Sequence, residues 1–173
     1  PNGYMTSAVK AFEAADAIKN GADEIDMVIN LSMVKDGCWV DVANDIRAVR
    51  EATRGKILKV IIECCLLTDE EKIHMCRIVA DCGADFIKTS TGKGYPGATF
   101  EAAYTMCKAI KTYHSITGNK VGIKISGGVR TAEDAVRYYT IVKEILGDEW
   151  LNKDLFRIGA SSLVGDIEKR LGK

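Results

Sequence analysis

The feature that most limits the possible folds of this chain is a regular alternation of two sequence patterns. Short apolar runs rich in β-branched residues are expected to be strands, and the segments between them repeat apolar residues at helical spacing. Strict alternation of this kind favours parallel βαβ units over an all-α or an all-β fold. We expect five strands, at 24–29, 57–63, 86–91, 121–126 and 155–160, and six helices, at 6–20, 40–53, 68–82, 131–146 and from 99 and 161 onward.

Local signals mark the helix boundaries. Thr68 is followed three positions later by Glu71, which is the spacing of a capping box, and Thr131 opens another helix in a similar way. Gly21 and Gly83 supply stops at helix carboxyl ends. No low-complexity linker divides the chain, so residues 1–173 are interpreted as one domain.

Composition excludes several classes of partner. The 24 basic residues balance the 24 acidic residues, so we expect a small partner, with no nucleic-acid or membrane surface. There is no signal peptide and no long apolar run, which favours a cytoplasmic protein. The six cysteines lack Cys-x-x-Cys spacing and are expected to be reduced core thiols, without a metal site.

Two of the expected βα units have similar sequences, which indicates an internal repeat. Residues 17–26 align with residues 79–88, and both segments carry Gly-Ala-Asp-x-Ile followed by a charged residue. The charged residues are Asp26 and Lys88. A βα repeat predicts that these two residues lie at equivalent heights in neighbouring strands.

Charged residues also occur in the other apolar runs. Glu63 ends one run and Lys124 lies inside another. A single such residue is equally compatible with an exposed edge or an ion pair, but four of them in consecutive parallel strands are expected to line a ligand crevice. Lys88 and Lys124 are the informative pair, because burial and mutual repulsion of two ammonium groups lower the pKa of a lysine. An uncharged amine near neutral pH is a nucleophile toward carbonyl groups.

Three loops are expected to form an anion cradle. They are 92–93, 126–131 and 158–162, and each places glycines or hydroxyls between a strand and a helix. Backbone N–H groups at a helix amino terminus bind anions, and barrels often build a phosphate site from the last two such loops. For any one glycine taken alone, a plain turn is the simpler interpretation.

Two other patterns are rejected. Residues 92–97 fit Gly-x-Gly-x-x-Gly, but Pro96 lies where the helix should begin and the next strand ends in Ser126 rather than an acidic residue, so a dinucleotide site is not expected. A phosphate-binding P-loop would need glycine at Ile87. His74 and His114 lie in expected helices, where a surface or packing role is favoured.

Four motifs together resemble the deoxyribose-phosphate aldolase family. The resemblance covers essentially the whole chain, and the first two motifs are highly specific to that family. They are Gly-Ala-Asp-Phe-Ile-Lys-Thr-Ser-Thr-Gly-Lys at 83–93, Val-Gly-Ile-Lys-Ile-Ser-Gly-Gly-Val-Arg-Thr at 121–131, Gly-Ala-Asp-Glu-Ile-Asp-Met-Val at 21–28 and Arg-Ile-Gly-Ala-Ser-Ser-Leu at 157–163.

The resemblance implies a class I aldolase on a (β/α)8 TIM barrel. Such an enzyme interconverts 2-deoxy-D-ribose 5-phosphate with D-glyceraldehyde 3-phosphate and acetaldehyde, without a metal or organic cofactor. By the motif match, Lys88 resembles the Schiff-base lysine, Lys124 the second lysine that lowers its pKa, and Asp26 the aspartate of the proton relay. The implied phosphate contacts are Gly92, Lys93, Gly127, Gly128, Arg130, Ser161 and Ser162.

The resemblance also sets an expectation for the amino end. A (β/α)8 barrel takes roughly 250 residues, whereas this chain opens on Pro1 and five strands are expected, so we expect an amino-terminally truncated barrel. Unpaired sheet edges favour association, and a homo-oligomer is expected. One alternative is an inactive fragment that needs another chain or self-association. A more distant alternative is another Schiff-base enzyme, such as a transaldolase-like aldolase.

Overall fold

The computed structural model describes residues 2–93 and 96–172. Within these residues five strands form one sheet in the order β1-β2-β3-β4-β5, and every neighbouring pair is parallel. The predicted α/β fold with five parallel strands is therefore confirmed. The strands are β1 (Glu24–Val28), β2 (Ile57–Ile61), β3 (Phe86–Lys88), β4 (Gly122–Ser126) and β5 (Phe156–Gly159).

Seven α-helices occur within the described residues, and six of them correspond to expected helices. The sequence pattern does not predict α2, because five residues are too few to show helical periodicity; Asn30 caps this helix by accepting a hydrogen bond from the Met33 backbone. The helices are α1 (Ser7–Lys19), α2 (Leu31–Lys35), α3 (Trp39–Ala52), α4 (Asp69–Asp81), α5 (Phe100–Thr117), α6 (Ala132–Leu146) and α7 (Leu163–Arg170).

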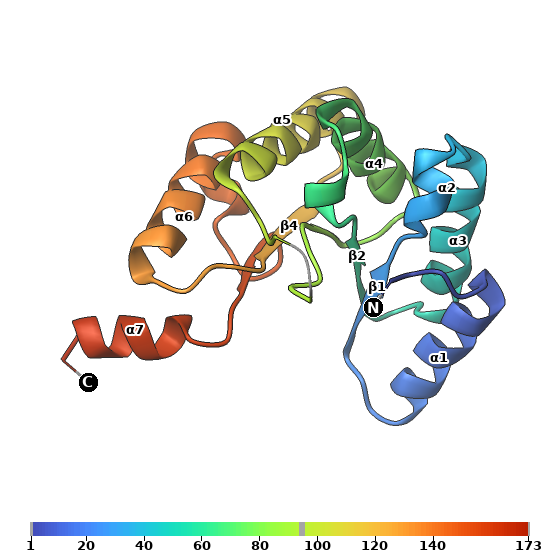
Figure 1. Cartoon of the computed structure of the whole chain (residues 1–173), viewed down its shortest axis with the longest axis horizontal. Helices are drawn as coiled ribbons and strands as arrows, with labels where there is room; N and C mark the ends of the chain where they lie inside the picture. The colour runs from blue at the N-terminus through green and yellow to red at the C-terminus, as the bar shows by residue number, and fades with distance from the viewer. Residues whose placement is uncertain (1, 94–95, 173) are drawn as a thin grey trace.

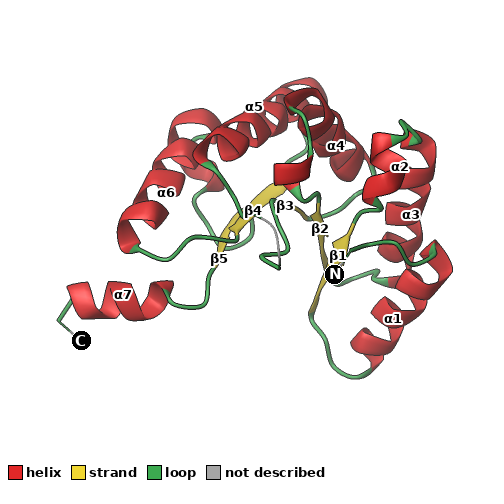
Figure 2. Cartoon of the chain, viewed as in Figure 1, coloured by secondary structure: helices red, strands yellow, loops and turns green. Residues whose placement is uncertain are grey.

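The sheet curves into an arc with helices on its outer side. Figure 1 shows α1, α3, α4, α5 and α6 following one another around the convex side, while α7 extends away at the carboxyl end. Figure 2 shows the strands on the concave side of the same arch. The two faces of the sheet therefore have different surroundings.

The outward face of the sheet builds the hydrophobic core. Alternate residues of β2 and the residue that follows it, Leu58, Val60 and Ile62, have no exposed surface and pack in one cluster with apolar side chains of the helices. Successive side chains of a strand point to opposite faces, so the intervening residues face inward. On that inner face Ile61 and Phe86 are buried outside the main cluster.

The predicted helix signals are confirmed in detail. Thr68 and Glu71 form a reciprocal capping box at the start of α4, and Thr131 and Asp134 form another at the start of α6. Each box satisfies two backbone N–H groups that the helix itself cannot pair. Gly21 and Gly83 both have positive φ, at 100° and 74°.

The two similar segments form the same turn, but the prediction that Asp26 and Lys88 lie at equivalent heights in neighbouring strands is wrong. In both copies the residue after the glycine bonds back to the helix, Ala22 to the Ala17 carbonyl and Ala84 to the Val79 carbonyl. However, β2 lies between β1 and β3, and the register places Asp26 level with Phe86, two residues before Lys88. The strands are staggered, as tilted strands in a curved parallel sheet are.

Two further expectations need correction. The β3 strand ends at Lys88 rather than at residue 91, although Thr89 continues to bond both neighbours through its backbone, to Cys64 and to the Lys124 carbonyl. All six cysteines are free, but Cys38 is exposed and Cys65 only partly buried, so the expectation of core thiols is wrong for these two. It is confirmed for the other four, Cys64, Cys76, Cys82 and Cys107.

Across residues 2–93 and 96–172, the structure contains no helix that is both long and apolar enough to cross a bilayer.

A buried ion pair fixes α1 against α3. The Lys10 amine lies 2.5 Å from Asp45, and the two side chains are only 5% and 3% exposed. Lys10 also donates to the Val28 carbonyl, and Ser7 donates to the other Asp45 oxygen. Each member of the pair thus has a second hydrogen-bond partner, which helps to offset the cost of burying two charges.

Asp45→Ala is therefore expected to lower the free energy of unfolding by about 3–5 kcal/mol, because it leaves the Lys10 ammonium buried without its partner. Urea denaturation measures the change. Glu13→Ala removes an exposed carboxylate from α1 and is the control, with an expected change within about 0.5 kcal/mol. Equal effects of the two substitutions would contradict the role assigned to the pair.

Candidate functional site

One carboxylate collects three lysine amines on the inner face of the sheet. Oδ2 of Asp26 in β1 accepts hydrogen bonds from Lys88 in β3 at 2.7 Å and from Lys124 in β4 at 2.9 Å. Its Oδ1 accepts from Lys59 in β2 at 3.0 Å. Four consecutive strands thus contribute one charged side chain each. The structure brings together all three predicted catalytic residues.

The strand register explains why these side chains meet. Lys88 and Lys124 are direct partners across the β3–β4 pair, so both side chains leave the sheet at one level on the same face. Asp26 starts two residues lower, and the long lysine side chains close the difference. The Lys88 and Lys124 side chains are 11% and 19% exposed, which places the amines in a partly buried but accessible position.

Electrostatics around Asp26 favour its charged form. Burial raises the pKa of Asp26, but the hydrogen bonds from Lys88, Lys124 and Lys59 outweigh burial and hold that pKa well below its usual range. Burial also lowers the pKa of Lys124; Asp26 opposes this effect, and the neighbouring charges of Lys88 and Lys59 add to it. The site therefore holds a firmly ionised carboxylate beside crowded amines.

This arrangement suits proton transfer coupled to addition of an amine. An amine can add to a carbonyl group only after it loses its proton, and a carboxylate within hydrogen-bonding distance can accept that proton. Because two amines contact the same oxygen, one can remain charged while the other reacts.

A second group of charged residues adjoins the first on the inner face, and it was not predicted from the sequence. Lys59 bridges Asp26 and Glu24, with a distance of 2.6 Å to Glu24. Glu24 also binds the Arg157 guanidinium through two hydrogen bonds of 3.0 and 3.2 Å. This pair joins the two edge strands, β1 and β5, across the concave face. Lys59 interrupts an apolar run just as Lys88 does, and that signal could have identified it.

Two of the three loops predicted to form an anion cradle lie against each other. Gly92 and Gly127 both have positive φ, and a Cβ built on Gly92 would lie 3.8 Å from the Gly127 Cα. The Ala98 backbone N–H donates to the carbonyls of Ser126 and Gly127, so the loops after β3 and β4 are in contact. Gly128, also at positive φ, and Arg130 are exposed in the second loop, as Lys93 is in the first.

The helix that follows the third loop, α7, contacts the amino terminus of α6. The Asp166 carboxylate in α7 accepts a hydrogen bond from the Ala132 backbone at 2.7 Å. Ser161 and Ser162 precede α7 and are exposed, and Ser162 makes no side-chain cap. The hydrogen bonds of the described residues do not join these two serines to the glycines, so their place in the cradle stays a prediction.

The two histidines and the rejected dinucleotide pattern were not predicted to take part in the site. His74 stacks on Trp39 with ring centroids 4.2 Å apart, and His114 packs edge-on against Trp150 at 5.1 Å, which confirms packing roles for both. Gly94 and Tyr95 of the rejected dinucleotide pattern lie outside the described residues. Gly97 is required by the close approach of Gly127, because a Cβ there would lie 2.1 Å from the Gly127 carbonyl oxygen.

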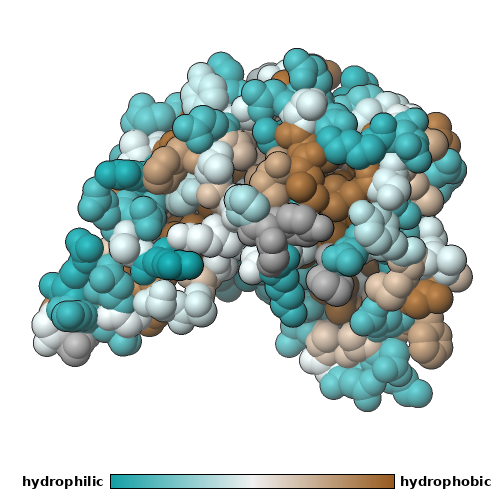
Figure 3. All heavy atoms as spheres, in the orientation of Figure 1, coloured by the Kyte–Doolittle hydropathy of each residue, from teal (hydrophilic) through white to brown (hydrophobic). Residues whose placement is uncertain are grey.

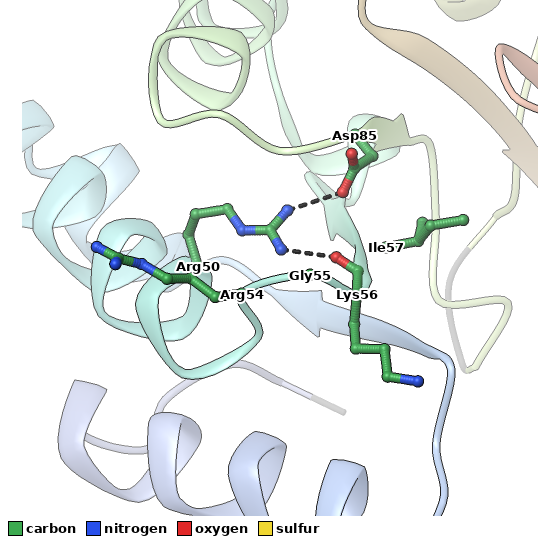
Figure 4. Close-up of a pocket in the computed structure, with 6 residues that line it drawn as sticks. All are labelled: Arg50, Arg54, Gly55, Lys56, Ile57 and Asp85. Carbon is green, nitrogen blue, oxygen red and sulfur yellow. Dashed lines mark hydrogen bonds and ion pairs between the residues drawn. The ribbon is translucent and has the colours of Figure 1, made fainter.

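Two hollows on the surface lie away from the lysine cluster. Figure 4 shows one of about 450 Å³ at the amino ends of β2 and β3, where Arg50 bonds Asp85 and the Lys56 carbonyl. Asp85 also accepts from the Leu58 backbone, so these groups are already satisfied and their role is structural. The other, of about 910 Å³, lies on the outer side of the arch between α4 and α5.

The space-filling view shows the outline of the concave side. Figure 3 shows a mainly hydrophilic outer rim and a deep notch on the concave side of the arch. The inner strand face, which carries the three lysines, belongs to this side.

Comparisons with known proteins identify the family of this chain. A family model described as DeoC/LacD family aldolase matches residues 2–163. The deoxyribose-phosphate aldolase of Streptococcus agalactiae is 50% identical over 147 residues, which are 85% of this chain and 63% of that protein. The chain spans 54% to 63% of the length of the curated relatives compared.

Solved structures show the same fold. A crystal structure from Coccidioides immitis matches with a TM-score of 0.84 and 37% identity, covering 99% of this chain and 61% of the other. The deoxyribose phosphate aldolase of Aeropyrum pernix, described as tetrameric, matches with a TM-score of 0.76 and 25% identity, covering 100% and 65%. Since the family model matches most of its length, the chain belongs to the DeoC/LacD family of aldolases.

Proposed function

We propose that this protein is a class I aldolase that cleaves 2-deoxy-D-ribose 5-phosphate reversibly to D-glyceraldehyde 3-phosphate and acetaldehyde. The observation that carries the proposal is the contact of two lysine amines with one carboxylate oxygen on the inner face of the sheet. The compared relatives are themselves named as aldolases for this substrate, so they do not favour the alternative of an inactive fragment.

Lys88 is the proposed nucleophile. In its uncharged form Lys88 adds to the aldehyde carbon C1 of the open-chain sugar. Asp26 takes and returns protons through a water during this step, and loss of water from the adduct gives an iminium. The iminium draws in the electron pair of the C2–C3 bond as the C3 hydroxyl loses its proton, which releases glyceraldehyde phosphate. The enamine that remains is protonated at C2 and hydrolysed to acetaldehyde. Lys124 is the proposed charged partner; that it keeps Lys88 uncharged stays a prediction.

The cradle is proposed to hold the phosphate of the substrate. Gly92 and Gly127 lie together at the ends of neighbouring strands, and the exposed Lys93 and Arg130 supply positive charge there. Gly128, Ser161 and Ser162 complete the proposed set. Phosphate bound at this remote end orients the aldehyde toward Lys88, so its binding energy contributes to turnover as well as to affinity.

The proposed whole protein is a (β/α)8 barrel of which these five strands form an arc. The curvature of the sheet and the cross-barrel pair of Glu24 and Arg157 support this proposal. A homo-oligomer is also proposed, supported by the tetramer described for the Aeropyrum pernix protein. A cytoplasmic location stays a prediction.

Reduction with borohydride in the presence of acetaldehyde tests the nucleophile. An ethyl adduct is expected on the peptide that contains Lys88, detected by mass spectrometry, and Lys88→Arg is expected to abolish it because the guanidinium does not lose its proton. Lys56→Arg, at the opposite end of the strands, is the control and should retain the adduct. An adduct at Lys59 or Lys124 instead, or none at all, would count against the proposal.

Asp26→Asn is expected to lower kcat about 10²–10⁴-fold, the range for a lost general acid–base group. It should also move the alkaline limb of the kcat/KM profile to lower pH. Asp26 raises the pKa of Lys124 against the effect of burial, so removing the carboxylate lets that pKa fall further, and the charged form of Lys124 is lost at lower pH. Asp23→Asn is the surface control. An alkaline limb that stays in place or moves to higher pH contradicts the assignment.

Arg130→Ala is expected to raise KM for the sugar phosphate about 10–100-fold, the range for one hydrogen bond to a charged group. Trapping of acetaldehyde on Lys88 should be unchanged, because acetaldehyde carries no phosphate. Arg137→Ala removes another exposed arginine from the same region and serves as the control. A matching loss of acetaldehyde trapping would show that Arg130 acts elsewhere.

A further inference from the structure

A buried glutamate organises the loop that follows the lysine strand. Glu63 lies two residues after Ile61, the last residue of β2, and it is 2% exposed. Its backbone has φ 49° and ψ 60°, and it is the one non-glycine residue with positive φ among residues 2–93 and 96–172. A side chain in this conformation is strained, and such strain persists only where the surroundings require it.

The contacts of Glu63 show what the strained conformation achieves. The carboxylate accepts a 2.6 Å hydrogen bond from the Thr91 hydroxyl and a further bond, at 3.2 and 3.3 Å to its two oxygens, from the Thr91 backbone N–H. The same hydroxyl accepts from the Lys93 backbone at 3.1 Å. Glu63 therefore holds Thr91 by two donors, and through Thr91 it holds the backbone of Lys93.

The clamped segment is anchored on both sides. The Thr89 carbonyl accepts from the Cys64 backbone at 2.8 Å, one residue after Glu63. Gly92, the next residue after Thr91, lies beside Gly127 of the neighbouring loop. The Glu63 carboxylate thus fixes the short stretch between Lys88 and the glycines. The described hydrogen bonds that this carboxylate accepts all come from Thr91, so it is not part of the lysine cluster.

We propose that Glu63 is a positioning residue that presets loop 89–93 to receive the phosphate of the substrate. This inference rests on the proposed function of that loop. A charged acceptor forms stronger hydrogen bonds than a neutral one, and a loop that is already ordered loses less conformational entropy when the phosphate binds. Glu63 touches neither the reacting carbon nor the phosphate in this proposal.

The test compares substrates that differ only in the phosphate. KM and kcat are measured with 2-deoxyribose 5-phosphate and with 2-deoxyribose for Glu63→Gly, Glu63→Gln and Thr91→Val. Glu63→Gly removes the carboxylate and also relieves the backbone strain, because glycine adopts positive φ freely, so a loss of function in this variant does not arise from a strained backbone. Glu70→Gln, an exposed glutamate at the start of α4, is the control.

The expected result is selective for the phosphate. Glu63→Gly should raise KM for the phosphorylated sugar about 10–100-fold and leave kcat/KM for 2-deoxyribose within about twofold. Glu63→Gln keeps an acceptor oxygen and should recover part of the loss. Thr91→Val removes the hydroxyl donor to Glu63 but keeps the backbone N–H donor, so it should cause part of this loss. The double variant should be no worse than Glu63→Gly, since Glu63→Gly already removes both contacts. Equal losses with both substrates, or an unchanged KM, would overturn the proposal.

Binding of inorganic phosphate, measured by calorimetry, separates this inference from the proposed function. If Lys88 forms no adduct with acetaldehyde but Glu63→Gly still weakens phosphate binding about tenfold or more, the aldolase proposal fails and the role of Glu63 stands. If the wild-type protein does not bind phosphate, or Glu63→Gly binds it as well as the wild type, the role of Glu63 is refuted.

Discussion

The inner face of this sheet depends on the shared carboxylate of Asp26. Three lysine amines converge on it, and without a central negative charge their mutual repulsion and partial burial would disfavour the folded arrangement. Removing one member of such a network leaves its partners without compensation, which is costly in a partly buried setting. A carboxylate with a strongly lowered pKa stays charged and is thus the electrostatic support of the inner face.

The curved sheet keeps this polar chemistry apart from the interactions that stabilise the fold. Strand side chains alternate, so the outward residues pack against the helices as an apolar core while the inward residues carry charge. The groups proposed for catalysis lie on strands, which hold them rigidly, and the glycines proposed for phosphate binding lie in the loops that follow. Glu63 connects these two parts, because it leaves β2 and holds the loop that continues from Lys88.

Much of this organisation is predictable from sequence, for identifiable reasons. Alternating periodicity predicts the five strands, and the interrupted apolar runs predict Lys88, Lys124 and Asp26 as a group. Lys59 interrupts a run in the same way, yet its importance becomes clear only when its contacts to Glu24 and Asp26 are seen. The stagger between strands is not predictable from a repeat, because it depends on how neighbouring strands pair. The pairing of Lys10 with Asp45 is likewise set by how α1 packs against α3.

The three lysine amines of the inner face differ in their contacts, and these differences favour Lys88 as the proposed nucleophile. Lys59 is held by two carboxylates, Glu24 and Asp26, and its side chain is 4% exposed, so its position is fixed. Lys88 and Lys124 share a single oxygen, and any movement of one amine from Asp26 strengthens the hold of that oxygen on the other. Lys88 directly precedes the loop that Glu63 clamps, whereas Lys124, its register partner at the same level, is followed by two more residues of β4. The proposed nucleophile is thus the amine whose strand runs directly into the proposed phosphate loop, and Lys124 is the proposed charged partner on the carboxylate.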